Sequence, residues 1–260
     1  MNLGLNNKCA LVTAASTGIG KAIAYKLSKE GCSVAICARD EKKLDKAIKE
    51  INHSNSIVAK IVVDMDEKES FDFIIDEMIS NFGKIDILVN NFGGGGKQID
   101  DKIENISDEV WEKTYHQNAL SASKLTMLSL PYMKNNNWGR VITIASINGR
   151  EGGGRPWYTM SKSAQISLMK TLSMKKEYSK YNITFNSIAP GAINTPGSQW
   201  EKIEKENPEK LKELISWKHP LGRLGTAKEI ADVVTFVSST KSSLLNGACI
   251  PLDGGESKSY

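Results

Sequence analysis

A tyrosine and a lysine stand four residues apart at Tyr158 and Lys162, and Ser146 ends an apolar run twelve residues before the tyrosine. Residues at i and i+4 of a helix face each other, so a helix here brings the lysine ammonium beside the phenol. A phenol has a pKa near ~10 and needs a fixed positive charge to act as an acid or base at neutral pH. Two unit charges about 4 Å apart attract by roughly 4 kcal/mol at an effective dielectric near ~20, comparable to about three pKa units. These three residues predict a proton-transfer site.

A second copy of the same spacing provides the alternative interpretation. Tyr25 and Lys29 also stand four residues apart, on the first expected helix. No serine at the end of a strand precedes them, so this copy predicts an ordinary helix surface. The spacing of Tyr158 and Lys162 therefore indicates a proton-transfer site only together with the strand and helix that position the two residues.

Composition sets the broad class of the protein. The chain has 260 residues, 40% of them hydrophobic and 25% charged, which suits a domain with a sizeable core. The net charge of +4 comes without a long basic block, so nucleic acid is not expected as a partner, while an anionic cofactor or substrate is compatible. The four cysteines and three histidines have no disulfide or metal-ligand spacing, and no metal is predicted. Because no secretory pattern and no run of ~20 apolar residues occurs, we expect a cytoplasmic protein without a membrane partner.

Short apolar runs alternate with amphipathic stretches along the chain. Strands are expected at residues 9–13, 33–37, 57–63, 85–89, 141–145, 183–188 and 248–252. Continuous apolar strands separated by helices are typical of a parallel sheet with helices on both faces. The sequence therefore predicts an α/β fold: one doubly wound Rossmann-type domain over residues 1–260, with a substrate-loop insert at about 195–225.

Helix starts are indicated by capping residues. Ser107, with acidic residues after it, predicts the start of a long helix over residues 107–134. A second long helix is expected over residues 156–179. Thr226 and Glu229 have the spacing of a capping box, which predicts the start of the last helix.

The turn between the first strand and the first helix, residues 13–20, has the composition of a nucleotide-binding turn. Its glycines let the backbone approach a pyrophosphate, and the helix N-terminus supplies free N–H groups and a favourable dipole. Its spacing is neither Gly-x-Gly-x-x-Gly nor that of a P-loop. After the second strand, Ala38 stands where an NAD-binding unit places an acid, and Arg39 follows. This favours NADP(H) and leaves NAD(H) as the alternative. Asp40 either caps the next helix or reaches the ribose.

These motifs, in this order, make the whole chain resemble the short-chain dehydrogenase/reductase family. Residues 13–20 look like its Thr-Gly-x-x-x-Gly-x-Gly turn, residues 90–93 like its Asn-Asn-Ala-Gly, and residues 186–191 like the segment before its nicotinamide pocket. The resemblance implies four catalytic residues, Asn118, Ser146, Tyr158 and Lys162. It implies cofactor contacts from Thr13, Ala15, Ser16, Thr17, Gly18, Ile19, Gly20, Arg39, Asp64, Asn91, Gly93, Tyr158, Lys162, Pro190, Gly191, Ile193 and Thr195.

The family's chemistry gives each catalytic residue an expected role. A hydride passes between nicotinamide and a carbonyl carbon, while Tyr158 gives or takes the proton on oxygen. Lys162 is expected to lower the phenol pKa and to hold the nicotinamide ribose, and Ser146 to bind the oxygen where charge develops. Asn118 is expected to hold a water that connects Lys162 to solvent. The prediction is an NADP(H)-dependent oxidoreductase; the rival hypothesis is a non-catalytic NADP(H)-sensing regulator.

The sequence departs from the family pattern at two positions. Ala14 replaces the first glycine of the turn, which should weaken the fit little if its φ is negative. Phe92 replaces a small alanine, and it either shapes the pocket wall or packs into the core. The glycine run at residues 93–96 follows it and is assigned no role.

The substrate is the least determined part of the prediction. Candidate contacts are Phe92, Asn148, Arg155 and Trp200. Arg155 and Arg150 flank three glycines and would attract an anionic group, or they are solvated loop charges. A 3-oxoacyl thioester on an acidic carrier, docked by Lys175 and Lys176, and a small sugar, polyol or cyclic ketone are both compatible. The resemblance also implies a homo-oligomer, a tetramer or else a dimer.

Overall fold

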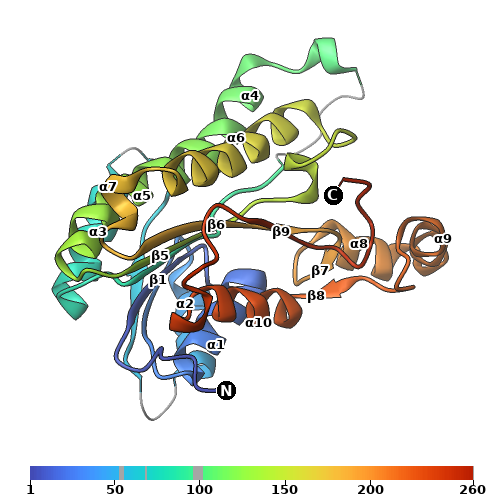
Figure 1. The fold of residues 1–260 in the computed structure, drawn as a ribbon. Helices are drawn as coiled ribbons and strands as arrows, with labels where there is room; N and C mark the ends of the chain where they lie inside the picture. The colour runs from blue at the N-terminus through green and yellow to red at the C-terminus, as the bar shows by residue number, and fades with distance from the viewer. Residues whose placement is uncertain (53–55, 68, 96–101, 260) are drawn as a thin grey trace.

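Seven parallel strands form one sheet in the order β3-β2-β1-β4-β5-β6-β9 (Figure 1). The computed structural model describes residues 1–52, 56–67, 69–95 and 102–259. The strands are β1 (Cys9–Thr13), β2 (Ser33–Ala38), β3 (Val58–Val62), β4 (Ile87–Asn90), β5 (Gly139–Ile144), β6 (Ile183–Pro190) and β9 (Cys249–Leu252). All seven lie within a few residues of the predicted positions, and the predicted fold class is confirmed.

Helices cover both faces of the sheet (Figure 1). One layer holds α1 (Gly18–Lys29), α2 (Glu41–Ile51) and α10 (Ala227–Val237), and the other holds α3 (Ser70–Phe82), α5 (Ser121–Asn135) and α6 (Pro156–Ser173). Alternate side chains of a strand point to opposite faces, so Ala10 and Val12 of β1 enter the first core while Cys9 and Leu11 enter the second. Two separate hydrophobic cores therefore fix the sheet from both sides.

The long helix predicted over residues 107–134 is interrupted. It consists of α4 (Asp108–Tyr115), a π-helical turn (His116–Leu120) and α5. The Asn118 side chain explains the interruption, because its Nδ2 donates to the Thr114 carbonyl at 2.8 Å, an oxygen that in a regular helix accepts from the backbone N–H four residues later. The helix predicted over residues 156–179 also breaks, because Lys175 adopts an extended conformation between α6 and the short α7 (Lys176–Ser179).

The predicted insert is a compact extension bounded by a two-stranded pairing of β7 (Ile193–Asn194) with β8 (Gly225–Thr226). It contains α8 (Gln199–Glu206) and α9 (Pro208–Lys218). Its own small core is formed by Ala192, Leu211, Leu224, Trp200, Ile203 and Ile215. The remaining short elements are the 3₁₀ turns η1 (Ile103–Asn105), η3 (Ile147–Gly149) and η4 (Thr240–Ser242).

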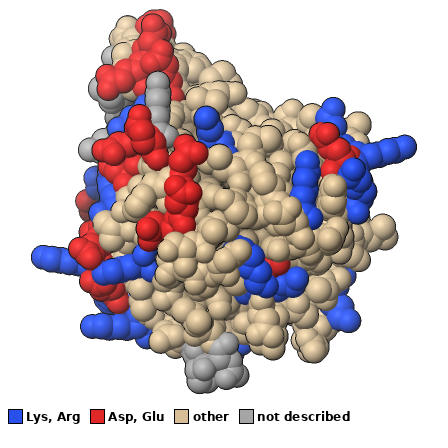
Figure 2. Space-filling model, turned by 90° about the vertical axis from the view of Figure 1, so that its left-hand side faces the viewer, with Lys and Arg blue, Asp and Glu red and all other residues tan. Residues whose placement is uncertain are grey.

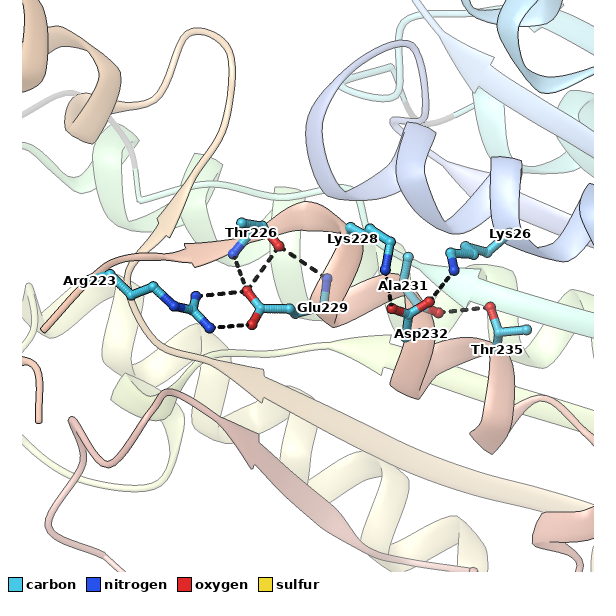
Figure 3. A network of polar contacts seen from close by, with 8 residues as sticks. All are labelled: Lys26, Arg223, Thr226, Lys228, Glu229, Ala231, Asp232 and Thr235. Carbon is cyan, nitrogen blue, oxygen red and sulfur yellow. Dashed lines mark hydrogen bonds and ion pairs between the residues drawn. The ribbon is translucent and has the colours of Figure 1, made fainter. Parts of the chain in front are cut away.

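Polar contacts at the start of α10 fasten the end of the insert to the domain (Figure 3). The predicted capping box is present, with Thr226 and Glu229 bonded reciprocally. Arg223 binds both Glu229 oxygens, at 2.7 and 3.1 Å, and this contact lowers the pKa of Glu229 to about 2. One turn later, Asp232 pairs with Lys26 of α1, so the two helices are joined by charge as well as by apolar packing.

Charged side chains of both signs are distributed over the molecular surface (Figure 2). On the face drawn in Figure 2, Lys and Arg side chains are scattered among acidic and uncharged ones instead of forming a continuous basic surface. None of the helices in the described part of the chain combines the length and the apolar character that a membrane crossing requires.

Candidate active site

A cavity of about 950 Å³ opens at the carboxyl ends of β4, β5 and β6. This is the edge where a doubly wound sheet binds ligands. Ser146, Tyr158 and Lys162 all line it, while Asn118 is fully buried behind its wall. Three of the four predicted catalytic residues are thus brought to one cavity, and the fourth lies in the layer that supports them.

Tyr158 is a partly buried phenol at the start of α6. Burial raises its pKa above the usual 10, and the hydrogen bond with Ser146 opposes this with a smaller effect. Lys162 Nζ lies 5.6 Å from the centre of the Tyr158 ring. The net shift of the Tyr158 pKa is upward because the loss of hydration outweighs the hydrogen bond with Ser146, and the lowering expected from Lys162 stays a prediction. Tyr158 is therefore a protonated phenol at neutral pH.

Lys162 is buried with two oxygen acceptors. Its Nζ donates to the Ile144 carbonyl at 2.8 Å and to Gln165 Oε1 at 3.0 Å. Burial lowers its pKa to about 7. No carboxylate in the described part of the chain forms an ion pair with it. The charge on Lys162 is consequently sensitive to small changes around it.

Asn118 makes hydrogen bonds through both its side chain and its backbone carbonyl. Its side-chain Nδ2 donates to the Gly94 carbonyl at 3.0 Å, which holds the loop after β4. Its backbone carbonyl accepts from Gln165 Nε2 at 2.8 Å. Gln165 is a residue that the sequence reasoning missed, although its position seven residues after Tyr158 places it on the same face of α6.

The turn before α1 leaves the helix N-terminus available. Thr17 is the N-cap residue, and its side chain makes no capping hydrogen bond. Gly18 has a positive φ of 59°, and at Gly20 a Cβ would lie 2.8 Å from the Ala14 carbonyl oxygen, so both positions require glycine. Free N–H groups at a helix start fit the diphosphate of a dinucleotide.

Thr13 anchors this turn to the end of β4. Its Oγ1 accepts from the backbone N–H groups of Asn91 and Phe92, both at 2.9 Å. The Asn91 side chain in turn donates to the Thr13 and Ala14 carbonyls, at 3.0 and 3.2 Å. The predicted motifs at residues 13–20 and 90–93 therefore form one structural unit beside the cavity.

The predicted cofactor residues fall into two groups. Besides Tyr158 and Lys162, those that line the cavity are Ile19, Asn91, Gly93, Pro190, Gly191, Ile193 and Thr195. The others lie outside its lining: Thr13, Ala15, Ser16, Thr17, Gly18, Gly20, Arg39 and Asp64. Arg39 and Asp64 follow β2 and β3, which extend the same sheet edge beyond β1. An extended dinucleotide would reach them with its adenosine half.

Asp40 is the N-cap of α2. Its Oδ1 accepts from the Lys43 backbone N–H at 3.0 Å, and this bond lowers the pKa of the carboxyl. Of the two roles left open for Asp40, helix capping is the one observed. Arg39 beside it is exposed and forms no ion pair with any residue that the structure describes.

Comparison with known proteins identifies the family. The family described as "Enoyl-(Acyl carrier protein) reductase" matches residues 13–257. The chain belongs to the short-chain dehydrogenase/reductase family. It is 32% identical to 3-oxoacyl-[acyl-carrier-protein] reductase FabG of Thermotoga maritima, over 96% of this chain and 98% of the relative. It is therefore an NAD(P)-dependent oxidoreductase acting on a CH–OH or C=O group.

Two solved structures show how close the fold is. L-sorbose reductase from Gluconobacter frateurii, complexed with NADPH and L-sorbose, superposes with a TM-score of 0.91, at 30% identity and with 100% of both chains covered. A 7α-hydroxysteroid dehydrogenase complexed with NADH superposes with a TM-score of 0.87, at 29% identity, covering 99% of this chain and 97% of that one. The solved structures that resemble this short-chain dehydrogenase/reductase thus include one complex with NADPH and one with NADH.

Ala14, the departure from the family's turn, is strained. Its φ is +51°, a left-handed conformation that is unfavourable for a residue with a Cβ, so the condition under which the substitution was expected to matter little is not met. Ala14 also lines the cavity, a contact that the sequence reasoning missed. Nothing in the sequence gives the sign of φ at this position.

We expect Ala14→Gly to stabilise the enzyme by about 1 kcal/mol, because glycine relieves the left-handed strain and the larger entropy of the unfolded chain offsets only part of the gain. Urea unfolding of the two proteins measures the change. Ala15→Gly is the matched control, since Ala15 is fully buried and has no positive φ; it should destabilise. Equal destabilisation by both substitutions would contradict the assignment of strain.

Of the predicted substrate contacts, Asn148, Arg155 and Trp200 line the cavity. Phe92 does not: it packs against the core on the side of α3 and α5, so its placement in the pocket wall is wrong. The chain after the end of β4 turns the Phe92 ring towards that core. Arg150 is likewise not among the lining residues. The last glycine of the run at residues 93–96 lies outside the described residues.

The C-terminal segment forms a wall that the sequence did not indicate. Glu256 lines the cavity, and its Oε2 accepts from the Ala192 backbone N–H at 2.8 Å and lies 3.5 Å from His219 Nδ1. Further on, Glu151 accepts from the backbone N–H groups of Lys258 and Ser259, at 2.7 and 2.8 Å. The Glu151 contacts join residues 107 and 108 positions apart, and the Glu256–Ala192 contact joins residues 64 positions apart, which local patterns do not predict. Among the residues that the structure describes, no cluster of three or more histidine, cysteine, aspartate or glutamate side chains could hold a metal ion.

Proposed function

We propose that this enzyme is an NADP(H)-dependent reductase of small polar ketones in which Tyr158 donates the proton. The observation that carries the proposal is the convergence of Ser146, Tyr158 and Lys162 on one cavity next to an open helix N-terminus. Because the pKa of Tyr158 lies above neutrality, the phenol carries the proton that carbonyl reduction requires.

Each side chain has one task in this proposal. The bound nicotinamide supplies the hydride. Ser146 donates a hydrogen bond to the carbonyl oxygen, where negative charge develops, and Tyr158 delivers its proton to the same oxygen. The Lys162 ammonium stabilises the phenolate that remains. Asn118 holds the loop after β4 through Gly94, which keeps that wall of the cavity in place.

The preference for NADP(H) rests on Arg39. An exposed guanidinium next to the end of β2, beside a carboxyl already engaged in capping, suits the 2′-phosphate. We expect Arg39→Ala to weaken NADPH binding about tenfold and to leave NADH binding unchanged, since one charged hydrogen-bond partner is lost. Fluorescence titration measures both affinities. Lys42→Ala, a substitution of another exposed cation nearby, is the control; equal losses for both cofactors would contradict the role of Arg39.

A small polar substrate fits the lining of the cavity. Beyond the catalytic residues, the wall carries Asn148, Gln199, Lys218 and Glu256, which offer hydrogen bonds to hydroxyl groups. The similarity to an L-sorbose reductase over the whole chain supports the same class. The second candidate is a 3-oxoacyl thioester, carrier-bound, which the similarity to a carrier-protein reductase favours. Lys175 and Lys176 are exposed on the surface where such a carrier would bind.

A substrate panel distinguishes these readings. Ketose sugars, cyclic ketones and 3-oxoacyl thioesters are each offered with NADPH and with NADH, and loss of the reduced cofactor's absorbance is followed. We expect turnover of the polar ketones with NADPH. Preference for the thioesters would favour the second candidate. Tight NADPH binding without turnover of any carbonyl would favour the regulatory alternative.

Assembly and location are proposed from the family resemblance. A homotetramer, or else a dimer, would use the two long helical segments at residues 107–134 and 156–179 and the C-terminal strand β9. On these helical segments Leu120, Met127 and Met160 are each more than 40% exposed. A cytoplasmic location is the companion proposal.

A further inference from the structure

We propose that Gln165 is a positioning residue of the proton-transfer site, whose side-chain amide links the Lys162 ammonium to the Asn118 carbonyl and fixes both. The role of this link in catalysis rests on the proposed function, whereas its effect on the titration of Lys162 does not. No motif in the sequence marks Gln165, and the family resemblance assigns it no part.

The amide of Gln165 uses both of its ends. Its Oε1 accepts from Lys162 Nζ at 3.0 Å, and its Nε2 donates to the Asn118 carbonyl at 2.8 Å. Reversing the amide would set two donors against each other at Lys162 and two acceptors at Asn118, so the neighbours determine its orientation. The side chain is completely buried, and no solvent competes for these bonds.

The two partners come from different helices. Tyr158, Lys162 and Gln165 follow one another along a single face of α6, whereas Asn118 belongs to the π-helical turn before α5. The Asn118 side chain is held by the Thr114 and Gly94 carbonyls. Gln165 therefore connects the residue that faces the cavity to a fixed point in the neighbouring helix. An amide has no proton to pass on at neutral pH, so this link orients the lysine and does not relay protons.

Because Lys162 is buried with few acceptors, the hydrogen bond from Lys162 to Gln165 influences whether the lysine is protonated. Two uncharged oxygens, from Ile144 and Gln165, favour the ammonium against burial, which lowers its pKa to about 7. Tyr158 is the titratable neighbour on the same helix. The other charged residues that line the cavity are Arg155, Lys218 and Glu256. Glu256, the acidic residue among these three, forms no ion pair with Lys162 in the described part of the chain.

Two substitutions should move the Lys162 titration in opposite directions. Gln165→Met removes the acceptor and should lower the midpoint by about one pH unit, because burial then acts with less compensation. Gln165→Glu is isosteric and sets a carboxylate beside the ammonium, which should raise the midpoint by about one unit or more. The midpoint is read by NMR of protein labelled at the lysine ε-carbon, with the signal assigned through Lys162→Met. The pH profile of kcat should shift in the same directions.

Ser129→Ala is the matched control. It also removes a buried hydrogen bond, from Ser129 Oγ to the Leu125 carbonyl at 2.7 Å, and should leave the midpoint unchanged. Identical midpoints in wild type and both Gln165 variants would overturn the proposal; if Gln165→Met does not fold, an unshifted midpoint in Gln165→Glu suffices. An enzyme that turns over no carbonyl would contradict the proposed function, and the lysine titration would still decide the role of Gln165.

Discussion

Replacing Tyr158 by phenylalanine is expected to reduce carbonyl reduction by about a thousandfold or more, while NADPH binding changes by less than about threefold. The substitution removes one hydroxyl and keeps the ring, so the packing of α6 and the cavity walls should survive. The proton that the substrate oxygen must receive then has no donor. Single-turnover absorbance measurements with NADPH and the best substrate of the panel report the chemical step directly.

The chain contains its own control for this experiment. Tyr25 and Lys29 have the same spacing on α1, and Tyr25 is 37% exposed. Tyr25→Phe removes the same hydroxyl from the same motif and should leave turnover unchanged. Parent-like reduction by Tyr158→Phe would show that Tyr158 is not the donor, and a loss of NADPH binding of similar size would assign it to cofactor binding instead.

The comparison of these two tyrosines explains why the candidate site could be predicted from the sequence. Sequence spacing gives both pairs the same helical geometry. Only Tyr158 lies on the helix that follows β5 and Ser146, and the carboxyl ends of parallel strands meet at one edge of the sheet. The positions of the strands along the chain follow from their apolar runs, so this placement could be inferred. The same reasoning located Arg39 and the glycine turn.

Other features depend on backbone angles or on distant contacts, and local patterns do not contain them. The sign of φ at Ala14 and the π-helical turn at Asn118 are set by packing around them. The wall that Glu256 forms depends on contacts with Ala192 and His219. The sequence left two placements for the Phe92 side chain, the pocket wall and the core. The path of the chain after β4 places it in the core. Each of these belongs to tertiary structure.

The expected pKa of Tyr158 shows what a pairwise estimate omits. The attraction between a lysine ammonium and a phenolate was estimated at full charge, without the free energy of removing either group from water. In the folded protein that loss of hydration raises the pKa of Tyr158 and lowers the pKa of Lys162. Burial thus opposes the charge that catalysis needs, which has a consequence for stability.

Lys162→Met should abolish turnover and, at the same time, remove a pH dependence of stability. The pKa of Lys162 falls from 10.5 to about 7 on folding, so between these values the unfolded chain binds more protons than the folded protein. Stability of the wild type should accordingly rise with pH across this window, and the burden of the buried ammonium should be fully present below pH ~7.

The stability difference between wild type and Lys162→Met isolates this effect, because every other titrating group is common to both proteins. Between about pH 6 and pH 10 the wild type should gain roughly 2–5 kcal/mol relative to the variant, an order-of-magnitude value from the size of the shift. Urea unfolding without cofactor measures it at each pH. Lys29→Met, at an exposed position of α1, should give a difference that does not vary with pH. A pH-independent difference for Lys162→Met would mean that the buried lysine keeps its ordinary pKa. A difference that rises with pH would mean that the Lys162 ammonium, on which the proposed mechanism depends, lowers the stability of the folded enzyme.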